Sequence, residues 1–361
     1  MRIAIDAREL LGHRTGVGRY LHELLQAWSA DRSAHDASIT LCAPAPIDLT
    51  PYGGLHVSMA QANGAGVWWE QHVLPRLVEQ AGADVLFAPG YTAPLWLATP
   101  SVVVLHDVSF AAHPEWFTWK EGARRRTIGR LAAERATQVI AVSAFSKREI
   151  QTHFGITPSK ISVIHNGVTP MRPSSGGSTE PPTVLFVGSI FNRRHVPLLI
   201  EAVAELGRRG RRVRLDIIGD NRTTPHVDLS AHATAVGLRD VVIRNYVADD
   251  ELRRAYAASR AFAFLSEYEG FGLTPLEALS ADVPPVVLDT PFTREIYGDD
   301  AVYASQLTVP AVTDALTQAL FDEGTRTGIL RRAADRLTRY RWASAARATM
   351  DVLRAAAARK A

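Results

Sequence analysis

Short apolar segments alternate with longer amphipathic ones along the first half of the chain. Between Tyr20 and Trp28 the apolar side chains recur at helical spacing. The short apolar segments stand at 1–6, 39–42, 85–88, 102–105 and 139–142. Because strands that alternate with helices pair in parallel, this half is expected to form a parallel sheet with crossover helices.

The same alternation returns in the second half. Apolar segments stand at 183–187, 213–218, 241–243, 261–265 and 284–289, and helical spacing is found over 196–206 and 342–360. Residues 169–182 are rich in proline, glycine and serine and have no apolar periodicity, which is typical of a linker. We therefore expect an α/β protein of two domains, 1–168 and 183–341, joined by that linker.

Composition supports two globular domains and narrows the class of protein. A chain of 361 residues exceeds the size at which a single hydrophobic core keeps growing. The formal net charge is only +3 and the basic residues are spread among acidic ones, so nucleic acid is not a favoured partner. Cys42, the single cysteine, excludes an intramolecular disulfide and a cysteine-based zinc site, and indicates a buried side chain in a reducing compartment. Without a signal peptide or about 18 uninterrupted apolar residues, the protein is expected to be soluble and cytoplasmic.

The stretch from Glu269 to Glu277 combines the features of an anion-binding turn. It follows an apolar strand segment, passes through a turn at Gly272 and enters a helix expected to begin near Thr274. The unpaired N–H groups around Leu273 and Thr274 would lie at the positive end of the helix dipole. Because carboxylates accept hydrogen bonds from sugar hydroxyls, two glutamates beside such amides suit a ligand with both hydroxyls and phosphate.

A family resemblance rests on this motif. Seven residues separate Glu269 from Glu277, with Glu-Gly-Phe-Gly-Leu at the first and Pro284 shortly after the second. The arrangement resembles the signature of the retaining glycosyltransferases of family 4, and the resemblance extends over nearly the whole chain. It implies the GT-B fold, in which two Rossmann-like domains have parallel sheets facing across a cleft. The N-terminal domain, with residues 342–361 packing back on it, would bind the acceptor, and the C-terminal domain would bind the nucleotide sugar.

The resemblance assigns roles within the motif. Glu269 would orient the donor sugar and stabilise positive charge on it, and Glu277 would bind ribose hydroxyls. Donor phosphates would contact the backbone of Gly272, Leu273 and Thr274. Two positions depart from the family pattern, because Thr274 stands where many members have proline and Asp282 where glycine is usual. Aspartate visits the left-handed backbone region at modest cost, so the turn at Asp282 is expected to survive.

A second phosphate-binding candidate follows the first strand. Gly16 and Gly18 stand between segment 1–6 and the helical pattern that starts at Tyr20. A Gly-x-Gly turn also occurs for conformational reasons alone, and a dinucleotide fingerprint is incomplete because Leu21 stands at its third glycine. In the resembling family a glycine pair at this place faces the donor diphosphate through its backbone, a role that the resemblance gives to Gly16 and Gly18.

His106 and Asp107 directly follow segment 102–105, at the end of a strand where functional loops of parallel sheets lie. A histidine after a strand is more often structural. The pair is followed by His113-Pro-Glu, and this order is similar to a family pattern whose first histidine lies beside the donor sugar. The resemblance therefore makes His106 a catalytic candidate, whereas Asp107 is expected to hold the local loop.

Arg193 and Arg194 follow the first strand of the second domain. Two guanidinium groups at a strand's end suit a diphosphate, although paired arginines are usually only solvated. The resembling family has Arg-Lys-Asn here, so Arg193 matches the pattern and Arg194 replaces a lysine. Family members also hold the nucleobase, largely through backbone groups, near the turn that here contains Tyr246 and Val247.

Two helix starts carry residues that favour caps. Ser143 precedes a helical segment, and Asp249 or Asp250 precedes another. The side chains of serine and aspartate accept hydrogen bonds from the free N–H groups of a helix's first turn. We expect structural caps at both places.

Aromatic and basic residues are interleaved over 113–130. Trp116, Phe117 and Trp119 stand close to Lys120 and to a run of arginines from Arg124 onward. This composition suits contact with an anionic membrane surface or with a lipid-linked acceptor. An ordinary amphipathic helix packed on the sheet is the alternative.

Together these residues predict a metal-independent, retaining α-glycosyltransferase without a cofactor. The chain has no Asp-x-Asp pair and no His and carboxylate cluster spaced for a divalent metal. The contexts of His106, Arg193 and Glu269 are most similar to a mannosyltransferase-rich branch, which predicts GDP-mannose as donor and a glycan or lipid-linked acceptor. The alternatives are a UDP- or TDP-sugar donor, a nucleotide-sugar epimerase of the GT-B type, and a non-catalytic nucleotide-sugar-binding protein.

Overall fold

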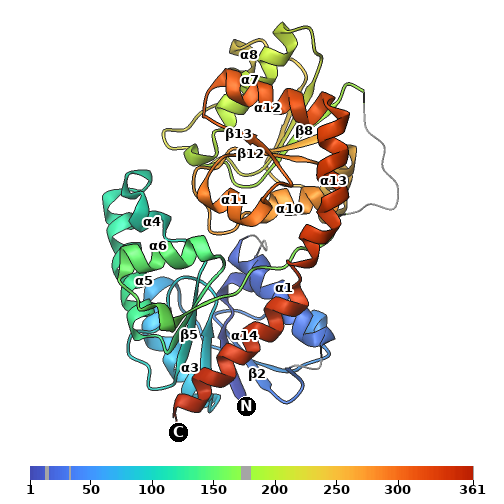
Figure 1. Ribbon diagram of the computed structural model, residues 1–361. Helices are drawn as coiled ribbons and strands as arrows, with labels where there is room; N and C mark the ends of the chain where they lie inside the picture. Colours follow the sequence, from blue (N-terminus) through green and yellow to red (C-terminus); the bar gives the residue numbers. More distant parts are fainter. Residues whose placement is uncertain (13–15, 32–33, 172–179, 361) are drawn as a thin grey trace. The chain divides into compact units, whose positions relative to one another are not determined.

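The computed structural model describes the chain except for residues 13–15, 32–33, 172–179 and 361. The chain divides into two compact units, drawn in Figure 1. Unit 1 comprises Met1–Gly167 with Tyr340–Ala361, and unit 2 comprises Val168–Arg339. Of the linker predicted at 169–182, residues 172–179 lie outside the described part of the chain.

Unit 1 is built on a seven-stranded parallel sheet in the order β3-β2-β1-β4-β5-β6-β7. Its strands are β1 (Arg2–Asp6), β2 (Ser38–Ala43), β3 (His56–Gln61), β4 (Val85–Ala88), β5 (Ser101–Leu105), β6 (Gln138–Ala141) and β7 (Ile161–Val163). Strands β4, β5 and β6 are buried along their whole length. Burial of this kind belongs to parallel sheets whose crossover helices cover both faces, which explains the continuous apolar runs in the sequence.

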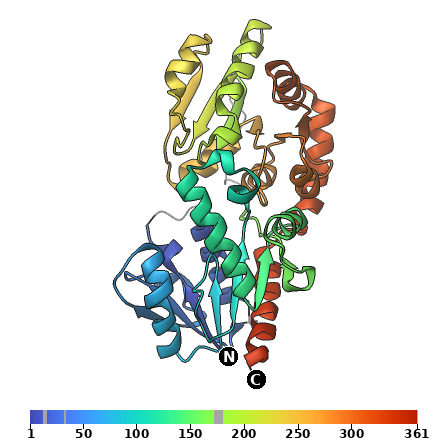
Figure 2. The same ribbon diagram turned by 90° about the vertical axis from the view of Figure 1, so that its left-hand side faces the viewer.

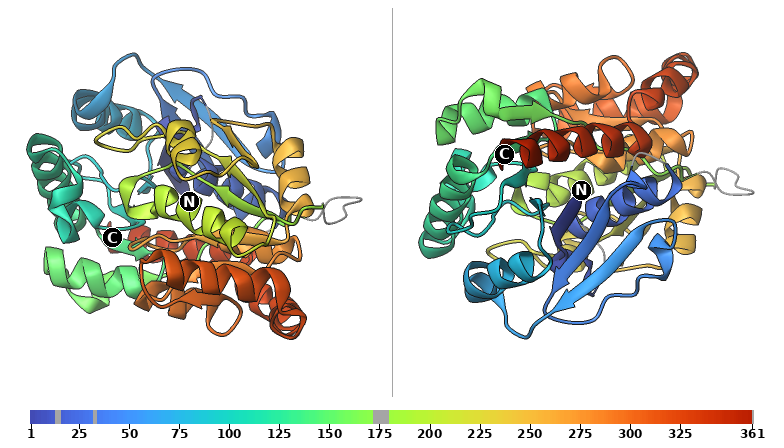
Figure 3. Two further views of the ribbon diagram at one scale, coloured as in Figure 1. Left: turned by 90° about the horizontal axis from the view of Figure 1, so that it is seen from above. Right: turned by 90° about the horizontal axis from the view of Figure 1, so that it is seen from below.

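The helices of unit 1 are α1 (Val17–Ala30), α2 (Gly66–Trp68), α3 (Leu74–Gln80), α4 (Ser109–Ala112), α5 (Trp119–Arg135), α6 (Ala144–Phe154) and α14 (Trp342–Ala357). In Figure 2, α5 runs along the side of unit 1 that is turned to the viewer. Helix α14 comes from the end of the chain and lies beside α1, as Figure 3 shows. There the indole Nε1 of Trp28 donates to the carbonyl of Ala346 at 2.8 Å. The long-range packing of α14 therefore completes the core of unit 1.

Unit 2 has a six-stranded parallel sheet in the order β10-β9-β8-β11-β12-β13. Its strands are β8 (Thr183–Val187), β9 (Arg214–Ile218), β10 (Val241–Arg244), β11 (Ala261–Phe264), β12 (Pro285–Leu288) and β13 (Val302–Ala304). Its helices are α7 (Val196–Arg208), α8 (Leu229–Ala235), α9 (Asp249–Ala258), α10 (Leu273–Ser280), α11 (Pro291–Tyr297), α12 (Val309–Phe321) and α13 (Glu323–Thr338). Helix α12 packs beside α7, and α10 beside α13; in Figure 1 α7 and α12 lie above the strands and α10 and α11 below them.

Each sheet contains one point at which the strand order reverses. In unit 1 it lies between β1 and β4, and in unit 2 between β8 and β11. Ligands of open parallel sheets bind beyond the carboxyl ends of the strands at such a point. The fold thus directs attention to the loops that follow these four strands.

Several local predictions can be compared with the structure. The α/β class with two parallel sheets is confirmed. Cys42 is buried, the Ser143 hydroxyl caps α6 by accepting from the Ser146 N–H at 2.9 Å, and Asp282 has a left-handed backbone with φ +61°. The cap predicted at Asp249 or Asp250 is wrong, because the chain enters α9 one residue earlier, after Ala248, and places both aspartates in the first turn. There they face the positive end of the helix dipole.

Across the part of the chain that the structure describes, none of the helices has the length and apolar character that crossing a bilayer requires.

Candidate active site

The turn before α10 is shaped by a glycine. Gly272 has φ +78°, and a Cβ there would lie 2.3 Å from the hydroxyl of Tyr297, which donates to the Gly272 carbonyl at 2.7 Å. Both the backbone conformation and the close approach therefore require glycine. Among the described residues no side chain caps α10. The amides of Leu273 and Thr274, both half-buried residues, begin an uncapped helix and are available to an anion.

Glu269 forms an ion pair with Arg194 in the turn that follows β11. The Nε and Nη2 atoms of Arg194 both lie 2.8 Å from Oε1 of Glu269, and the Ser266 hydroxyl donates to the same oxygen at 3.0 Å. Arg193 is the next cation, with Nε 3.9 Å away. Burial by itself raises the pKa of Glu269, but Arg194 and Arg193 together with these hydrogen bonds outweigh it and hold the pKa below its ordinary value. Glu269 is thus an ionised carboxylate near neutral pH, and the three groups carry a net positive charge.

The loop that precedes α7 positions the two arginines. Asn192–Arg194 form a turn of 3-10 helix, and His195 has a left-handed backbone with φ +49° before α7 begins. The Glu267 N–H donates to the Arg193 carbonyl at 3.0 Å, and Nε2 of His195 lies 2.6 Å from Oε1 of Glu267. These contacts join the loop before α7 to the turn before α10. The two helix N-termini therefore belong to one region of unit 2, at its strand-order reversal.

Glu277 and the residues predicted to hold the nucleobase lie on separate elements. Glu277 is only 1% exposed on α10 and accepts from the Tyr256 hydroxyl at 3.0 Å. Val247 is buried and Tyr246 is 62% exposed, both in the turn after β10. The strand order places β10 two strands away from β8. The structure thus brings Arg193, Arg194 and Glu269 together and leaves Tyr246 and Val247 further along the same edge of the sheet.

In unit 1, Gly16 and Gly18 are glycines for different structural reasons. Gly16 precedes α1 with φ +54°, and a Cβ added there would meet no atom within 4 Å, so its backbone conformation alone favours glycine. A Cβ on Gly18 would lie 2.1 Å from the carbonyl oxygen of Glu9, so packing demands glycine there. Gly16, His195 and Gly272 all give left-handed entries to helices that no described side chain caps. A side chain caps the starts of α5, α6, α8, α11, α12 and α13, whereas α9 and α14 begin without a cap from any described side chain but after an extended residue.

His106 is held from several sides at the carboxyl end of β5. Its Nε2 lies 2.9 Å from the Pro89 carbonyl oxygen, and its own carbonyl accepts from the Ser146 hydroxyl at 3.0 Å. The rings of Tyr20 and Tyr91 contact its ring at centroid distances of 4.9 Å and 5.5 Å. Burial lowers the pKa of His106, more than the Pro89 carbonyl and Asp107 raise it. The imidazole is therefore neutral at pH 7.

Asp107 holds the loop, as predicted. Its Oδ1 accepts from the Ser109 N–H at 2.8 Å, and its Oδ2 accepts from the Tyr91 hydroxyl at 3.0 Å. The contact to Tyr91 was not expected from the sequence, because the two residues belong to loops after different strands. Asp107 thus links the loop after β5 to the loop after β4.

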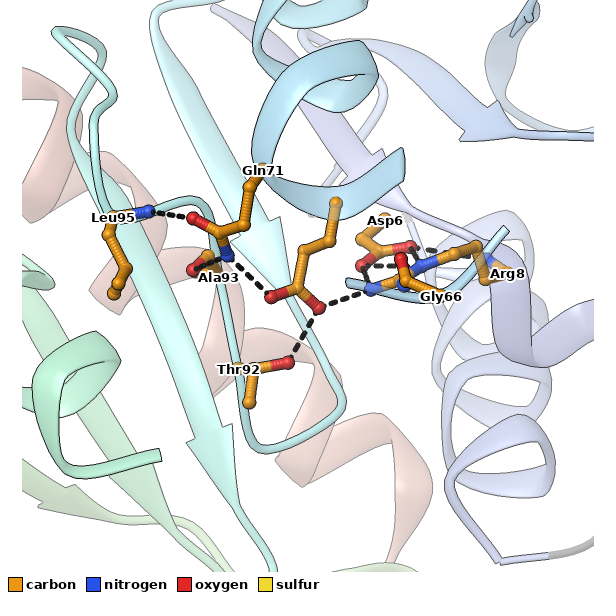
Figure 4. Close-up of polar contacts among 8 residues, drawn as sticks. Asp6, Arg8, Gly66, Gln71, Thr92, Ala93 and Leu95 are labelled. Carbon is orange, nitrogen blue, oxygen red and sulfur yellow. Dashed lines mark hydrogen bonds and ion pairs between the residues drawn. The ribbon is translucent and has the colours of Figure 1, made fainter. Parts of the chain in front are cut away.

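Sequence reasoning missed a charged network at the strand-order reversal of unit 1, shown in Figure 4. Arg8 donates from Nη2 to Oδ2 of Asp6 and to Oε2 of Glu70, both at 2.6 Å. Burial disfavours the guanidinium charge, but the two carboxylates outweigh it and raise the pKa of Arg8. Asp6 at the end of β1 was a visible signal, since parallel strands end at the functional edge. Glu70 offered no signal, because it lies far away in sequence within an amphipathic segment.

Within the described residues, no three histidine, cysteine, aspartate or glutamate side chains are arranged as a set that could hold a metal ion.

Comparison with known proteins relates both units to one group of enzymes. A family model described as "Glycosyltransferase Family 4" matches residues 14–172, and one described as "Glycosyl transferases group 1" matches residues 169–336. The D-inositol 3-phosphate glycosyltransferase of Kineococcus radiotolerans is 30% identical over an alignment of 299 positions, and the match covers 73% of this chain and 68% of that protein. The GDP-mannose:cellobiosyl-diphosphopolyprenol alpha-mannosyltransferase of Komagataeibacter xylinus is 29% identical over an alignment of 227 positions, and the match covers 61% of this chain and 57% of that protein. Further relatives at 26 to 28% identity are also named mannosyltransferases.

A solved structure extends the likeness to the whole fold. HepE (Alr3699) of Anabaena, in complex with UDP-glucose, superimposes with a TM-score of 0.76 at 18% identity, covering 98% of this chain and 100% of that one. At this identity the likeness establishes the fold alone, and it confirms the predicted GT-B class.

Proposed function

The chain belongs to the glycosyltransferases of family 4, and we propose that it transfers mannose from GDP-mannose, with retention of configuration and without a metal ion, to a glycan or lipid-linked acceptor. The observation that carries the proposal is the group of Arg193, Arg194 and Glu269 beside the uncapped starts of α7 and α10. In this assignment unit 2 binds the nucleotide sugar and unit 1 binds the acceptor.

Stabilising the departing diphosphate is the largest catalytic task, because negative charge develops there in the transition state. Two guanidinium groups and one carboxylate leave a net positive charge at the strand-order reversal of unit 2. The amides of Leu273 and Thr274 add N–H donors at the positive end of a helix dipole. In unit 1 the backbone at Gly16 and Gly18 would contribute further donors. These groups can balance the diphosphate charge in place of a metal ion.

The other predicted residues receive positioning roles in the same proposal. Glu269 would orient the sugar and stabilise its cationic character, and His106 would contact the sugar from unit 1. Glu277 would bind ribose hydroxyls, and the backbone at Tyr246 and Val247 would hold the base. Retention would follow from attack of the acceptor on the face that the diphosphate leaves, with the departing phosphate oxygen taking the acceptor proton. This path needs no protein nucleophile.

The donor is proposed from relatives rather than from the geometry. Several relatives carry mannosyltransferase names, and one name specifies GDP-mannose. The structural neighbour HepE was solved with UDP-glucose, so a uridine nucleotide is the main competitor. Selectivity between the two must be measured on this protein.

Helix α5 gives some support to contact with a membrane. Trp119 at its start is 82% exposed, and Lys120, Arg124, Arg125 and Arg130 are exposed along it. Gly122, Gly129, Ala132 and Ala133 form its buried face, so the helix also packs on unit 1 as an ordinary amphipathic helix does. Of the other two aromatic residues, Phe117 packs on the core and Trp116 stacks on His113 at 4.0 Å. We propose that Trp119 and the basic side chains rest on an anionic membrane surface, where a lipid-linked acceptor would be found.

A nucleotide panel tests the site first. Melting temperatures are measured with GDP, UDP, TDP and NAD in the presence of EDTA, for the wild type and for Glu277→Gln. A ligand at a hundred times its Kd stabilises by about 2.7 kcal/mol, which is a readily measured shift. Stabilisation by GDP that weakens in Glu277→Gln supports the proposal. Stabilisation by UDP or TDP instead overturns the donor, and a response to none of the three diphosphates overturns the site.

Turnover then tests the chemistry. Release of GDP from GDP-mannose is followed with EDTA present, and the anomeric configuration of the transferred sugar is read by NMR. Glu269→Gln is expected to lose most of the activity, because it removes the charge that faces the sugar. Glu205→Gln is the matched control, since it makes the same change on α7, where the side chain pairs with Arg208 and Arg209 away from the site. Equal losses in both variants, or an inverted product, would contradict the mechanism.

A further inference from the structure

Residues 89–95, the loop between β4 and β5, contact two functional neighbourhoods of unit 1. On one side the loop touches His106 and Asp107 at the end of β5. On the other side it is hydrogen-bonded to Glu70 and Gln71, which lie in a helical turn next to α3. The loop thus connects the predicted sugar-contacting histidine to the charged network at the end of β1.

The contact with Pro89 determines which nitrogen of His106 carries the proton. A carbonyl oxygen can only accept, so Nε2 of His106, 2.9 Å from the Pro89 carbonyl, must be the donor. A neutral imidazole has one protonated nitrogen, and Nδ1 is then left with a lone pair. The described residues provide no hydrogen-bond partner for Nδ1. The ring is therefore prepared to accept a hydrogen bond from a hydroxyl group.

Tyr91 supports this arrangement at a conformational cost. Its φ of +64° lies in the left-handed region, which is uncommon for a residue with a Cβ and persists only where the surroundings enforce it. The Tyr91 N–H donates to the Val104 carbonyl at 3.0 Å, its ring contacts the His106 ring, and its hydroxyl donates to Asp107. An unfavourable backbone conformation is thus maintained where three contacts converge around the histidine.

The opposite side of the loop is held by hydrogen bonds to Glu70 and Gln71. The Thr92 hydroxyl donates to Oε2 of Glu70 at 2.6 Å, and Glu70 is itself paired with Arg8. As Figure 4 shows, Gln71 donates to the Ala93 carbonyl at 3.2 Å and accepts from the Leu95 N–H at 2.8 Å. Glu70 is only 4% exposed, so the hydrogen bond from Thr92 ends on a carboxylate shielded from water, where it is stronger. The residues next to Tyr91 therefore have little freedom to relax.

We propose that residues 89–95 form a rigid support that keeps His106 in its Nε2–H tautomer, with Nδ1 accepting from a hydroxyl of the donor sugar, and that Tyr91 and Thr92 are positioning residues for it. The inference rests on the proposed function, since it gives the histidine a role in contacting the donor. It adds two residues that touch neither the nucleotide nor the diphosphate in that proposal. Substitution of Tyr91 or Thr92 should therefore lower turnover and leave nucleotide affinity unchanged.

Two conservative variants and one control test the support. Tyr91→Phe removes the hydroxyl that contacts Asp107 and keeps the ring, and Thr92→Val removes the hydroxyl that contacts Glu70 and keeps the shape. Tyr52→Phe is the control, because the Tyr52 hydroxyl lies 2.8 Å from Nδ1 of His22, a second tyrosine and histidine pair in unit 1. Thr92→Ser restores the hydroxyl and serves as the rescue. Far-ultraviolet circular dichroism checks that each variant is folded.

The first measurement is the tautomer. Histidine side chains are labelled with ¹⁵N, and the His106 signals are assigned by their absence in His106→Gln. The wild type should show a protonated Nε2 and an unprotonated Nδ1. Tyr91→Phe and Thr92→Val should shift or broaden these signals, and Tyr52→Phe and Thr92→Ser should leave them unchanged. A wild-type ring protonated at Nδ1, or His106 signals that do not respond to either variant, would overturn the inference.

The second measurement is turnover of GDP-mannose. Because a misplacement of about 1 Å can cost about 100-fold, kcat should fall about tenfold or more in Tyr91→Phe and Thr92→Val. KM should change less than about twofold, since nucleotide contacts remain. Losses no larger than that of Tyr52→Phe would refute the positioning role. If the wild type does not turn over GDP-mannose, or if His106→Gln is fully active, the proposed function fails, while the tautomer measurement still decides whether the support exists.

Discussion

Replacing Arg194 by alanine should destabilise unit 2 in a pH-dependent way. The side chains of Arg194 and Glu269 are 15% and 13% exposed, so the pair is largely removed from water. The variant loses both contacts to Glu269 and the hydrogen bond from Nη1 to the Ser189 carbonyl. Removing one partner of a buried pair costs about 3–5 kcal/mol. Because Arg193 and the Ser266 hydroxyl remain near Glu269, we expect the lower end, about 3 kcal/mol.

The sign of the pH dependence follows from the pKa of Glu269. This pKa is lowered in the folded protein, so the associated stability is present above the unfolded value of about 4.3 and is lost as the pH falls through the lower folded value. Without Arg194 the pKa of Glu269 should rise. The difference in unfolding free energy between wild type and Arg194→Ala should therefore be largest near neutral pH and should shrink in acid, where Glu269 is protonated in both proteins.

Hydrogen exchange measured by mass spectrometry is the suitable assay. All seven tryptophans lie in unit 1, so tryptophan fluorescence cannot report on unit 2, whereas peptides from β8 and β11 can. Arg208→Ala is the control, because Arg208 is 55% exposed in its pair with Glu205 on α7 and such a surface pair contributes about 0–1 kcal/mol. The reasoning is refuted if Arg194→Ala lowers the opening free energy no more than Arg208→Ala, or if its effect is undiminished in acid.

Three further predictions concern packing, donor binding and the membrane. Gly219→Ala should destabilise the protein by about 1–3 kcal/mol in thermal unfolding, because its Cβ would lie 1.9 Å from the Gly188 carbonyl oxygen. Gly207→Ala on α7 should instead stabilise it by about 0.5–1 kcal/mol in the same experiment, because the added Cβ meets no atom within 4 Å. Arg193→Ala should weaken GDP binding about tenfold to a hundredfold by calorimetry, since a charged hydrogen bond contributes about 1.5–3 kcal/mol; unchanged affinity would remove Arg193 from the site. Trp119→Ala should reduce sedimentation with anionic vesicles at an unchanged melting temperature, and full retention would exclude this contact.

Much of the local architecture could be predicted because its physical causes are local. Short apolar runs separated by amphipathic segments predicted parallel strands and their helices, and burial of β4, β5 and β6 on both faces explains why those runs are continuous. The serine at 143 caps α6 through its neighbours in the chain, and Asp282 adopts the backbone conformation that its side chain tolerates. The cap expected at Asp249 or Asp250 failed because the entry point of a helix varies by a residue or two.

The candidate site also has one part that the sequence could predict and one part that it could not. Residue type and spacing marked Arg193, Arg194 and Glu269 as candidates, but they could not show that Arg194, rather than Arg193, makes the close ion pair with Glu269. Nothing local marked Glu70 as the partner of Arg8, since the two lie 62 positions apart in the sequence. Which carboxylates surround Arg8 depends on which strands are neighbours in the sheet, because the strand order brings the segment with Glu70 next to the end of β1.

By itself, the sequence determined ten of the thirteen strands that the structure describes, the parallel class of both sheets and the residue types expected to bind a nucleotide sugar, because hydrophobic periodicity and glycine placement act over a few residues. The edge strands β3, β7 and β13 were missed. Tertiary structure alone decided which charges pair and which nitrogen of His106 holds the proton. It also decided that Tyr91 adopts a left-handed backbone. Such features depend on groups that meet only after β4 and β5 pair and the helices pack, so no short stretch of the chain contains the information that specifies them.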